Sequence, residues 1–152
     1  MTAREPAMEP KLSYTTHDDI PHEAGRLIDS GLGASNDEAA PLHDVERLSC
    51  FARLASGEVV AGAVGRTWGE CCELQQLWVD RRHRRKGIGT ELVRRFEACA
   101  SERGCSTFYL ETFSFQAPAL YIGLGYQVAL ELHGFPQDIA KFVLVKRVAP
   151  AG

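Results

Sequence analysis

The stretch from Leu77 to Val93 joins a strand-like pattern to a helix-like pattern through a basic loop that contains two glycines. Residues 71–79 alternate in polarity, which is typical of a β-strand. After the loop, apolar residues recur at steps of three and four, which is typical of a helix with one buried side; they are Leu92, Val93, Phe96, Cys99 and Ala100. The sequence therefore predicts a joint of strand, loop and helix.

The loop of this joint has the composition of an anion-binding site. The first peptide N–H groups of a helix have no intrahelical partner and lie at the positive end of the helix dipole. Gly87 and Gly89 leave no side chain between these donors and an approaching phosphate, while Arg84, Arg85 and Lys86 add positive charge. The chain lacks both G-x-x-x-x-G-K-[ST] and the early, three-glycine Rossmann fingerprint, so neither common nucleotide-binding motif explains the loop.

The composition excludes several classes of function. The net charge of −3 on 152 residues argues against a dedicated nucleic-acid-binding protein. Five of the 17 Lys and Arg nevertheless lie between Arg81 and Lys86, so positive charge is concentrated at the predicted anion site. No apolar run approaches the ~20 residues that span a bilayer, and the start of the chain has no apolar signal core, so we expect a cytoplasmic protein without a membrane partner.

The cysteines and histidines show no spacing typical of a metal site. The cysteine number is odd and no C-x-x-C occurs, so we expect neither a disulfide framework nor bound zinc. We expect the cysteines to be reduced and buried; they are Cys50, Cys71, Cys72, Cys99 and Cys105.

The order of predicted elements indicates an α+β fold built in α/β layers. A loose tail at residues 1–10 precedes a single domain at 11–152. Strands are predicted at 11–16, 47–55, 59–68, 71–79, 107–112, 127–132 and 140–147. Helices are predicted from a cap at Asp18 or Asp19 to Gly31 or Gly33, with a stripe of Ala24, Leu27, Ile28 and Leu32, and then at 37–42, 89–103 and 118–125. Residues 34–46 are expected to form a lid that faces the substrate.

These elements predict a mixed sheet of six or seven strands, mostly antiparallel, with about four helices. The helix at 89–103 connects the strands at 71–79 and 107–112, so this crossover should be right-handed and the two strands parallel.

Two motifs in this order carry a family resemblance. They are Arg84-Arg-Lys-Gly87-Ile-Gly89 at the helix start and Tyr121-Ile-Gly-Leu-Gly-Tyr126 in the later short helix. The pattern resembles the GNAT superfamily of acyl-CoA-dependent N-acyltransferases, in particular its small, single-domain bacterial-type members, over about residues 11–147. The resemblance implies the GNAT fold, in which a β-bulge splays the fourth strand from its parallel neighbour.

The resemblance also implies how the chain holds acetyl-CoA. The pantetheine arm would lie along the strand at 71–79, beside Leu77, Trp78 and Val79, with the Leu77 N–H polarising the thioester carbonyl. The pyrophosphate would bind the loop and helix start, whose residues are Arg84, Arg85, Lys86, Gly87, Ile88, Gly89 and Thr90. Ser114 stands where the family often carries a coenzyme-binding asparagine, and Gln116 is the alternative for that hydrogen bond.

Acyl transfer to an amine requires a base for the amine and an acid for the departing thiolate. Glu73 matches the position of a glutamate base in several family members, Glu111 on the neighbouring strand is its rival, and water chains are a third route. A structural ion pair is the alternative explanation for Glu73. Tyr121 matches the tyrosine that faces the coenzyme sulfur, and crevice filling is its alternative. Four aromatic residues are large enough to wall an acceptor pocket, although core packing explains each one singly; they are Trp68, Trp78, Phe113 and Phe115.

The resemblance therefore predicts an acetyl-CoA-dependent N-acetyltransferase. Its acceptor would be a small primary amine, acetylated directly in a ternary complex, because no activated cysteine nucleophile is evident. Two alternatives stay open: acetylation of a protein lysine or N-terminus, and a non-catalytic acyl-CoA-binding module. Family members often dimerise through their C-terminal strands, which makes a homodimer an expectation.

Overall fold

The computed structural model of the protein describes residues 3–149. These residues form two compact units, one up to Ala40 and one from Pro41 onward, and each is described by itself. No helix within the described residues is long and apolar enough to cross a membrane.

The first unit consists of an extended segment and one helix, α1 (His22–Ala39). The predicted strand at 11–16 is wrong, since residues 3–21 contain no strand. Within residues 11–16 only Leu12 and Tyr14 are large and apolar, which is little apolar surface to bury against the entropy of ordering a strand.

Helix α1 also differs from its predicted ends. Its N-cap is Pro21 and no side chain caps it, contrary to the expected cap at Asp18 or Asp19. The helix continues through Gly31 and Gly33 and takes in the first half of the predicted short helix at 37–42, since it ends at Ala39. A helical glycine costs only about 1 kcal/mol relative to alanine, so it is a weak stop signal. The helix ends where Ala40 turns extended before a proline. No residue of α1 is buried, contrary to the predicted stripe.

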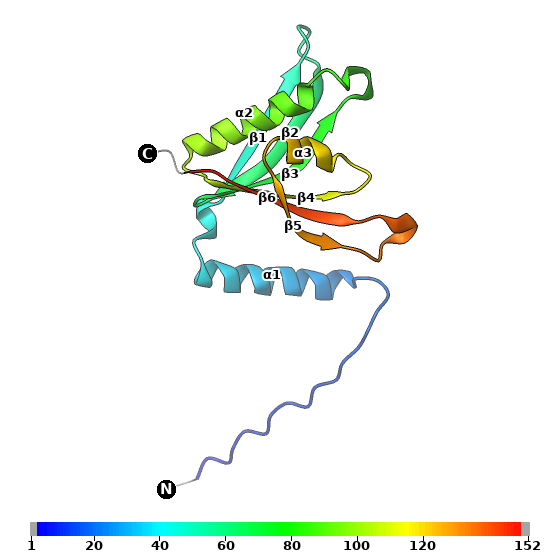
Figure 1. Cartoon of the computed structure of the whole chain (residues 1–152). Helices are drawn as coiled ribbons and strands as arrows, with labels where there is room; N and C mark the ends of the chain where they lie inside the picture. Colours follow the sequence, from blue (N-terminus) through cyan, green and yellow to red (C-terminus); the bar gives the residue numbers. More distant parts are fainter. Residues whose placement is uncertain (1–2, 150–152) are drawn as a thin grey trace. The chain divides into compact units, whose positions relative to one another are not determined.

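The second unit contains the sheet and two helices (Figure 1). Its elements are a 3-10 turn (Leu42–Asp44), β1 (Glu46–Arg53), β2 (Val59–Trp68), β3 (Cys71–Val79), a 3-10 turn (Arg81–His83), α2 (Ile88–Glu102), β4 (Thr107–Phe113), α3 (Pro118–Gly123), β5 (Gln127–Leu132), a 3-10 turn (Pro136–Asp138) and β6 (Lys141–Arg147). The described residues thus contain six strands and three α-helices. Six is the lower of the two strand numbers expected, and the helices are one fewer than the four expected.

The sheet has the strand order β1-β2-β3-β4-β6-β5. Four of its neighbouring pairs are antiparallel and β3 with β4 is parallel, which confirms the predicted mixed sheet. The parallel ladder ends early, because β3 pairs with β4 only from Cys71 to Glu73. The ladder of β2 with β3 shifts at the same place, since Val64 faces Gln76 and Gly65 faces Leu74. Gln75 is therefore the extra residue of a β-bulge, and beyond it β3 is splayed from β4.

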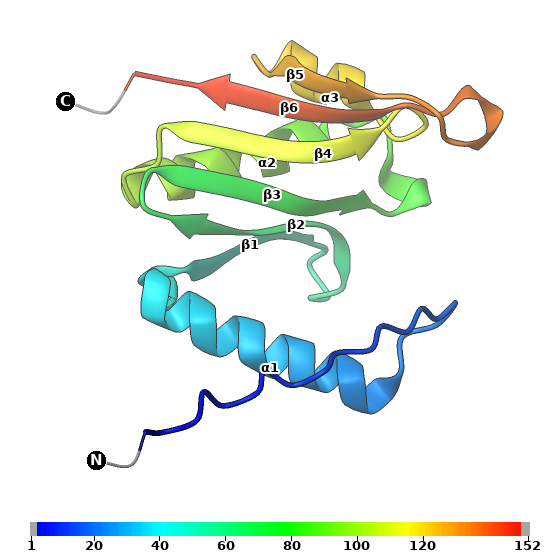
Figure 2. The same cartoon turned by 90° about the horizontal axis from the view of Figure 1, so that it is seen from below.

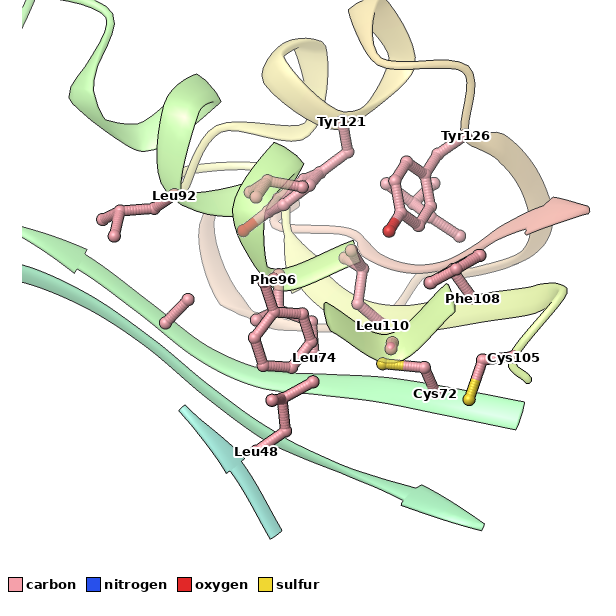
Figure 3. Packing of buried hydrophobic residues seen from close by; sticks show 14 of the residues in the cluster. Leu48, Cys72, Leu74, Leu92, Phe96, Cys105, Phe108, Leu110, Tyr121 and Tyr126 are labelled. Carbon is pink, nitrogen blue, oxygen red and sulfur yellow. The ribbon is translucent and has the colours of Figure 1, made fainter. Parts of the chain in front are cut away.

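One face of the sheet carries both helices of this unit, as Figures 1 and 2 show. Helix α2 packs against β1, β2 and β3. The core lies between helices and sheet, and its largest fully buried side chains are Phe96, Leu110, Leu144 and Val93. In Figure 3, Tyr121 and Tyr126 lie next to each other in this core, and Phe96, Leu74 and Leu48 extend it toward β1. The alternation of β3 and β4 leaves Glu73 and Glu111 on the other face of the sheet.

The cysteines are only in part as buried as expected. All five are free thiols, and Cys72 and Cys105 are buried. Cys50 and Cys99 are half-buried, and Cys71 is exposed, so the expectation of a fully buried set is wrong. Because side chains alternate along a strand, adjacent Cys71 and Cys72 point to opposite faces of β3.

Candidate active site

A cavity of about 950 Å³ opens where β3 and β4 diverge, between the N-terminus of α2 and helix α3. This volume is at the upper end of those typical for small-molecule and cofactor sites. Most of the residues predicted to hold the coenzyme line it: Leu77, Trp78, Val79, Arg84, Arg85, Gly87, Ile88, Gly89, Thr90 and Gln116. The predicted catalytic residues Tyr121 and Glu111 line it as well. Lys86, Ser114 and Glu73 lie outside this lining.

The loop between β3 and α2 is held by its own side chains. The Asp80 carboxylate accepts hydrogen bonds from the backbone N–H of Arg82 at 2.8 Å and from its guanidinium at 3.0 and 3.1 Å. These bonds lower the pKa of Asp80 to about 2, so the side chain stays charged. Arg84 Nε donates to the Val79 carbonyl at 3.0 Å. Arg82 and Arg84 therefore shape the loop, a role that basic composition alone did not reveal.

The start of α2 presents backbone donors to this cavity. Its N-cap is Gly87, in the left-handed region at φ 76°, and no side chain caps the helix. Arg85 is also left-handed, at φ 61°. A Cβ at Gly89 would lie 3.4 Å from Leu120 and 3.7 Å from Val79, on the cavity wall. The first turn of α2 thus offers an uncapped, positively polarised end to an anion.

Tyr121 reaches the cavity from α3, which begins with Pro118 in its first turn. The residue is 8% exposed, and burial raises the pKa of its hydroxyl to about 12. Within residues 3–149, every fully buried side-chain oxygen has a hydrogen-bond partner. The Tyr121 hydroxyl makes no hydrogen bond to any of these residues, so it is not fully buried. That hydroxyl is therefore open to the cavity and stays protonated at neutral pH.

A buried ionic network, which the sequence did not reveal, lies behind Tyr121. Lys146 Nζ contacts the two Glu97 carboxylate oxygens at 2.6 and 3.2 Å, and the Tyr126 hydroxyl donates to Glu97 at 3.4 Å. The rings of Tyr121 and Tyr126 meet edge to face, with centroids 5.9 Å apart (Figure 3). Burial and the nearby Glu97 carboxylate raise the pKa of Tyr126. The network joins α2 to β6 and supports the inner side of Tyr121.

A second cavity, of about 380 Å³, contains Glu73, Phe113 and Lys141 in its lining. It shares five lining residues with the first cavity: Leu74, Gln75, Glu111, Thr112 and Gln116. These shared residues lie where the β3–β4 ladder has ended. The two cavities therefore adjoin at the gap between the splayed strands, with Tyr121 in the lining of one and Glu73 in the lining of the other.

The two carboxylates of the second cavity each have a basic partner. Glu73 Oε2 accepts from Arg66 Nε at 2.9 Å and from the Tyr109 hydroxyl at 3.3 Å. Glu111 Oε2 lies 3.0 Å from Lys141 Nζ. The Glu73 side chain is 22% exposed and that of Glu111 is 58% exposed. Sequence reasoning missed all three partners, although Arg66 faces Glu73 directly across β2 and β3.

Ser114 and Gln116 differ in position. Ser114 Oγ accepts from the Ala140 N–H at 3.1 Å and lies outside both cavity linings. Gln116 lines both cavities, while its Oε1 accepts from the Phe113 N–H at 2.8 Å. Of the two predicted alternatives for a coenzyme hydrogen bond, only Gln116 is in reach of the cavity.

Aromatic side chains surround the gap. Trp78 and Phe115 line the first cavity, Phe113 lines the second, and Trp68 lines neither. The rings of Phe113 and Phe115 are stacked, with centroids 5.4 Å apart and an angle of 9°. No cluster of three or more His, Cys, Asp or Glu side chains able to hold a metal ion occurs in the described part of the chain.

Comparisons with known proteins agree with this geometry. The model of the acetyltransferase (GNAT) family matches residues 15–126. Blasticidin-S acetyltransferase of Streptomyces morookaense is 37% identical over 112 residues, which are 73% of this chain and 80% of that protein.

Two solved structures are similar over nearly their whole length. An acetyltransferase from Bacillus cereus superimposes with a TM-score of 0.75 at 25% identity, covering 88% of this chain and 98% of that one. A protein from Agrobacterium tumefaciens described as a putative acetyltransferase gives a TM-score of 0.75 at 26% identity, covering 90% and 100%. The family match, the relative and the shared fold agree, and the chain therefore belongs to the acetyltransferase (GNAT) family and is an acetyl-CoA-dependent acetyltransferase.

Proposed function

We propose that the protein transfers an acetyl group from acetyl-CoA to a primary amine of a small molecule, directly and within a ternary complex. One observation carries this proposal: two cavities meet between the splayed strands, with the Tyr121 hydroxyl open to one and the Glu73 carboxylate in the other. A thioester that enters from the side of α2 and an amine that enters from the other face of the sheet would meet in that gap.

The first cavity supports the coenzyme side of the proposal. The pyrophosphate would accept hydrogen bonds from the backbone N–H groups between Arg85 and Thr90, at the uncapped end of α2. The pantetheine arm would then follow β3 beyond Glu73, where the ladder with β4 has ended. An extended arm would use backbone groups of Leu77 and Val79 in place of the missing strand partner.

The chemistry balances with the groups at the gap. The amine nitrogen attacks the thioester carbonyl carbon, and the Leu77 N–H stabilises the resulting oxyanion. The proton that the amine loses passes to Glu73, directly or through water, and collapse of the intermediate breaks the C–S bond. Tyr121 donates to the sulfur that departs, so the products are the N-acetylated amine and coenzyme A.

The pKa of Tyr121 limits how it acts. Its value of about 12 exceeds that of a free thiol, ~8.5, so full proton transfer to an exposed thiolate would cost about 5 kcal/mol. A thiolate in the same cavity is desolvated too, which raises its own pKa and narrows this difference. Tyr121 therefore donates a hydrogen bond as the C–S bond lengthens, and the proton follows as the sulfur becomes more basic.

Direct transfer is supported by the chemistry of the cavity walls. The described lining of the two cavities contains no cysteine, and the exposed Cys71 belongs to neither. A covalent acetyl-enzyme would need a nucleophile with an adjacent base at the gap.

A small-molecule acceptor is supported by the relative, which is described as an acetyltransferase of blasticidin-S. Two alternatives remain for comparison: a protein lysine or N-terminus as acceptor, and acyl-CoA binding without catalysis. Acyl-CoA binding without catalysis does not require Tyr121 and Glu73 on the two sides of the gap.

A coenzyme A release assay tests the proposal. The purified protein would be given acetyl-CoA with blasticidin-S, a panel of small primary amines, and peptides with free N-termini or lysines. We expect release of coenzyme A that depends on a small amine. Double-reciprocal plots of the initial rates, with both substrates varied, should intersect, as they do for transfer in a ternary complex. Release with peptides but with no small amine would identify a protein lysine or N-terminus as the acceptor. Ping-pong kinetics would exclude direct transfer. Acetyl-CoA binding without release would identify the protein as a non-catalytic acyl-CoA-binding module.

A further inference from the structure

The second cavity contains a cation that the protein itself supplies. Lys141 Nζ lies 3.0 Å from Glu111 Oε2 and 5.6 Å from the centroid of the Phe113 ring. A carboxylate and an aromatic face together are a favourable site for any cation. Phe115 stacks on Phe113, and Phe135 meets it edge to face at 5.6 Å, so the ring that faces Lys141 is held in place.

This cation lies beside the gap and not in it. Lys141 lines only the second cavity, whereas Glu111 lines both. Phe113 and Lys141 are paired residues of β4 and β6, two residues further along β4 than Glu111. Two residues of a strand span about 7 Å, so the backbone of Phe113 and Lys141 lies roughly that distance beyond the backbone of Glu111, in the direction away from the β3–β4 ladder, and the Lys141 side chain reaches back to the Glu111 carboxylate.

The contact between Lys141 and Glu111 is easily exchanged. The Glu111 side chain is 58% exposed and that of Lys141 is 29% exposed, and ion pairs open to solvent to this degree are weak. Lys141 has a flexible four-carbon stem that can move its ammonium into solvent. A ligand cation that takes the same place would therefore lose almost nothing in displacing it.

The charges of the cavity favour a cation over an anion once Lys141 leaves Glu111. Its titratable lining groups are two carboxylates and one ammonium: Glu73, Glu111 and Lys141. When a ligand displaces Lys141, Glu111 needs a new positive partner, whereas Glu73 keeps Arg66 at 2.9 Å.

We propose that Glu111, Phe113 and Lys141 form a cation subsite that selects acceptors with a second positive group remote from the amine that is acetylated. Lys141 fills the subsite in the free enzyme, and the second cation of the acceptor replaces it there. This inference rests on the proposed function, because it requires the acceptor to occupy the second cavity. It assigns Glu111 a role in recognition, distinct from that of a base.

Acceptors that differ only in their far end test the subsite. Three compounds share a primary amine on an alkyl chain. Cadaverine ends in an ammonium, hexylamine in a methyl group and 5-aminopentanoate in a carboxylate. Each would be measured by kcat/KM or, where it is not acetylated, by its competitive inhibition constant against the best acceptor of the release assay. We expect the ammonium to be preferred over the methyl by about tenfold, equivalent to about 1.4 kcal/mol.

Two variants then locate the preference. Glu111→Gln should reduce the ratio of ammonium to methyl to within about twofold, and Lys141→Met should raise it, because the internal competitor is gone. The ratio cancels any loss of rate common to both acceptors, so a Glu111 that acts as base would lower both equally and leave it unchanged. Glu46→Gln is the matched control, since its exposed pair with Arg103 lies outside both cavity linings.

Three results would overturn the inference. They are no preference for the ammonium, a preference that survives Glu111→Gln, and a preference for the carboxylate that Lys141→Met abolishes, which would make Lys141 an anion anchor. Each can occur in an active enzyme, so each leaves the proposed function intact. A protein that acetylates no amine and is inhibited by none would refute the proposed function and this inference with it.

Discussion

Gly65 on β2 approaches the backbone of Glu73 on β3 so closely that a Cβ at Gly65 would lie 1.9 Å from the Glu73 carbonyl oxygen. The same Cβ would lie 2.8 Å from the Phe96 ring. The contact lies next to the bulge, where Gly65 faces Leu74 and Gln75 is unpaired. Glycine at this position thus lets β2 and β3 pack closely at the place where β3 leaves β4.

Gly65→Ala should therefore strongly destabilise the protein. Its Cβ meets backbone that cannot move without shifting β3, and overpacking of this kind costs about 3 kcal/mol. For a domain of this size we expect the melting temperature to fall by roughly 6–12 °C. Differential scanning calorimetry would measure the change.

Gly62→Ala is the control on the same strand. Its Cβ would lie 2.7 Å from the ring of Phe51, a half-exposed side chain that can rotate away. We expect a loss of no more than about 1 kcal/mol. Equal losses for the two variants would mean that the approach of β2 to β3 does not depend on Gly65.

Strands with strong local signals could be predicted from the sequence to the residue. The predicted ranges 59–68, 71–79 and 127–132 agree with β2, β3 and β5, because alternation and turn residues are encoded locally. The loop and helix start at Gly87 could be predicted for the same reason, since Gly87, Gly89 and the basic run are contiguous. The parallel β3–β4 pair followed from the crossover rule and needed no tertiary information.

The partners of the catalytic candidates could not be predicted in the same way. Arg66 with Glu73 and Lys141 with Glu111 come together across strands, and a register shift of one residue would separate them. The bulge at Gln75 changes this register within β3 itself. The prediction of where α1 ends was wrong for another reason. Glycines within a helix are weak stop signals, and the boundary at Ala40 depends on the proline that follows.

Gly87→Ala should weaken acetyl-CoA binding beyond its effect on folding. Gly87 has φ 76°, and a Cβ there would meet no protein atom within 4 Å. The variant should lose about 1–2 kcal/mol of stability from the left-handed backbone. It should also bind acetyl-CoA at least about fivefold more weakly, because the new methyl and the strained loop disturb the phosphate donors. Isothermal titration calorimetry would measure the affinity.

Gly69→Ala is the matched control for this effect. Gly69 is also left-handed, at φ 57°, with nothing within 4 Å of its Cβ, but it lies in the turn between β2 and β3. It should lose similar stability with no change in affinity for acetyl-CoA. An equal loss of affinity in both variants would contradict a phosphate site at the start of α2.

Tyr121→Phe should lower kcat by about 10- to 100-fold while acetyl-CoA affinity changes less than about twofold. The ring that packs on Tyr126 is retained, and only the hydroxyl open to the cavity is lost. Steady-state kinetics and equilibrium binding separate the two effects. Unchanged turnover would remove Tyr121 from the chemistry.

Tyr126→Phe is the control for the tyrosine substitution. Its hydroxyl donates to Glu97 and its side chain lines neither cavity. We expect it to lower stability by about 1–3 kcal/mol, because the hydroxyl hydrogen-bonded to a buried carboxylate is lost. Its kcat should stay within about threefold of the parent. A large fall in kcat would instead show that the Glu97 network acts on Tyr121.

Alkaline pH should destabilise the fold through Cys72. Burial, followed by the nearby Cys105, raises the pKa of Cys72 from 9.0 to about 12. Above pH 9 the folded state therefore holds a proton that the unfolded state releases, so stability falls as pH rises and the loss ends near pH 12. By pH 10.5 this one thiol should account for about 2 kcal/mol. Cys72→Ala should be less stable at pH 8 but lose less between pH 8 and 10.5 in urea titrations with reductant. Equal losses of stability in the two proteins between pH 8 and 10.5 would show that Cys72 ionises as readily in the folded state as in the unfolded state.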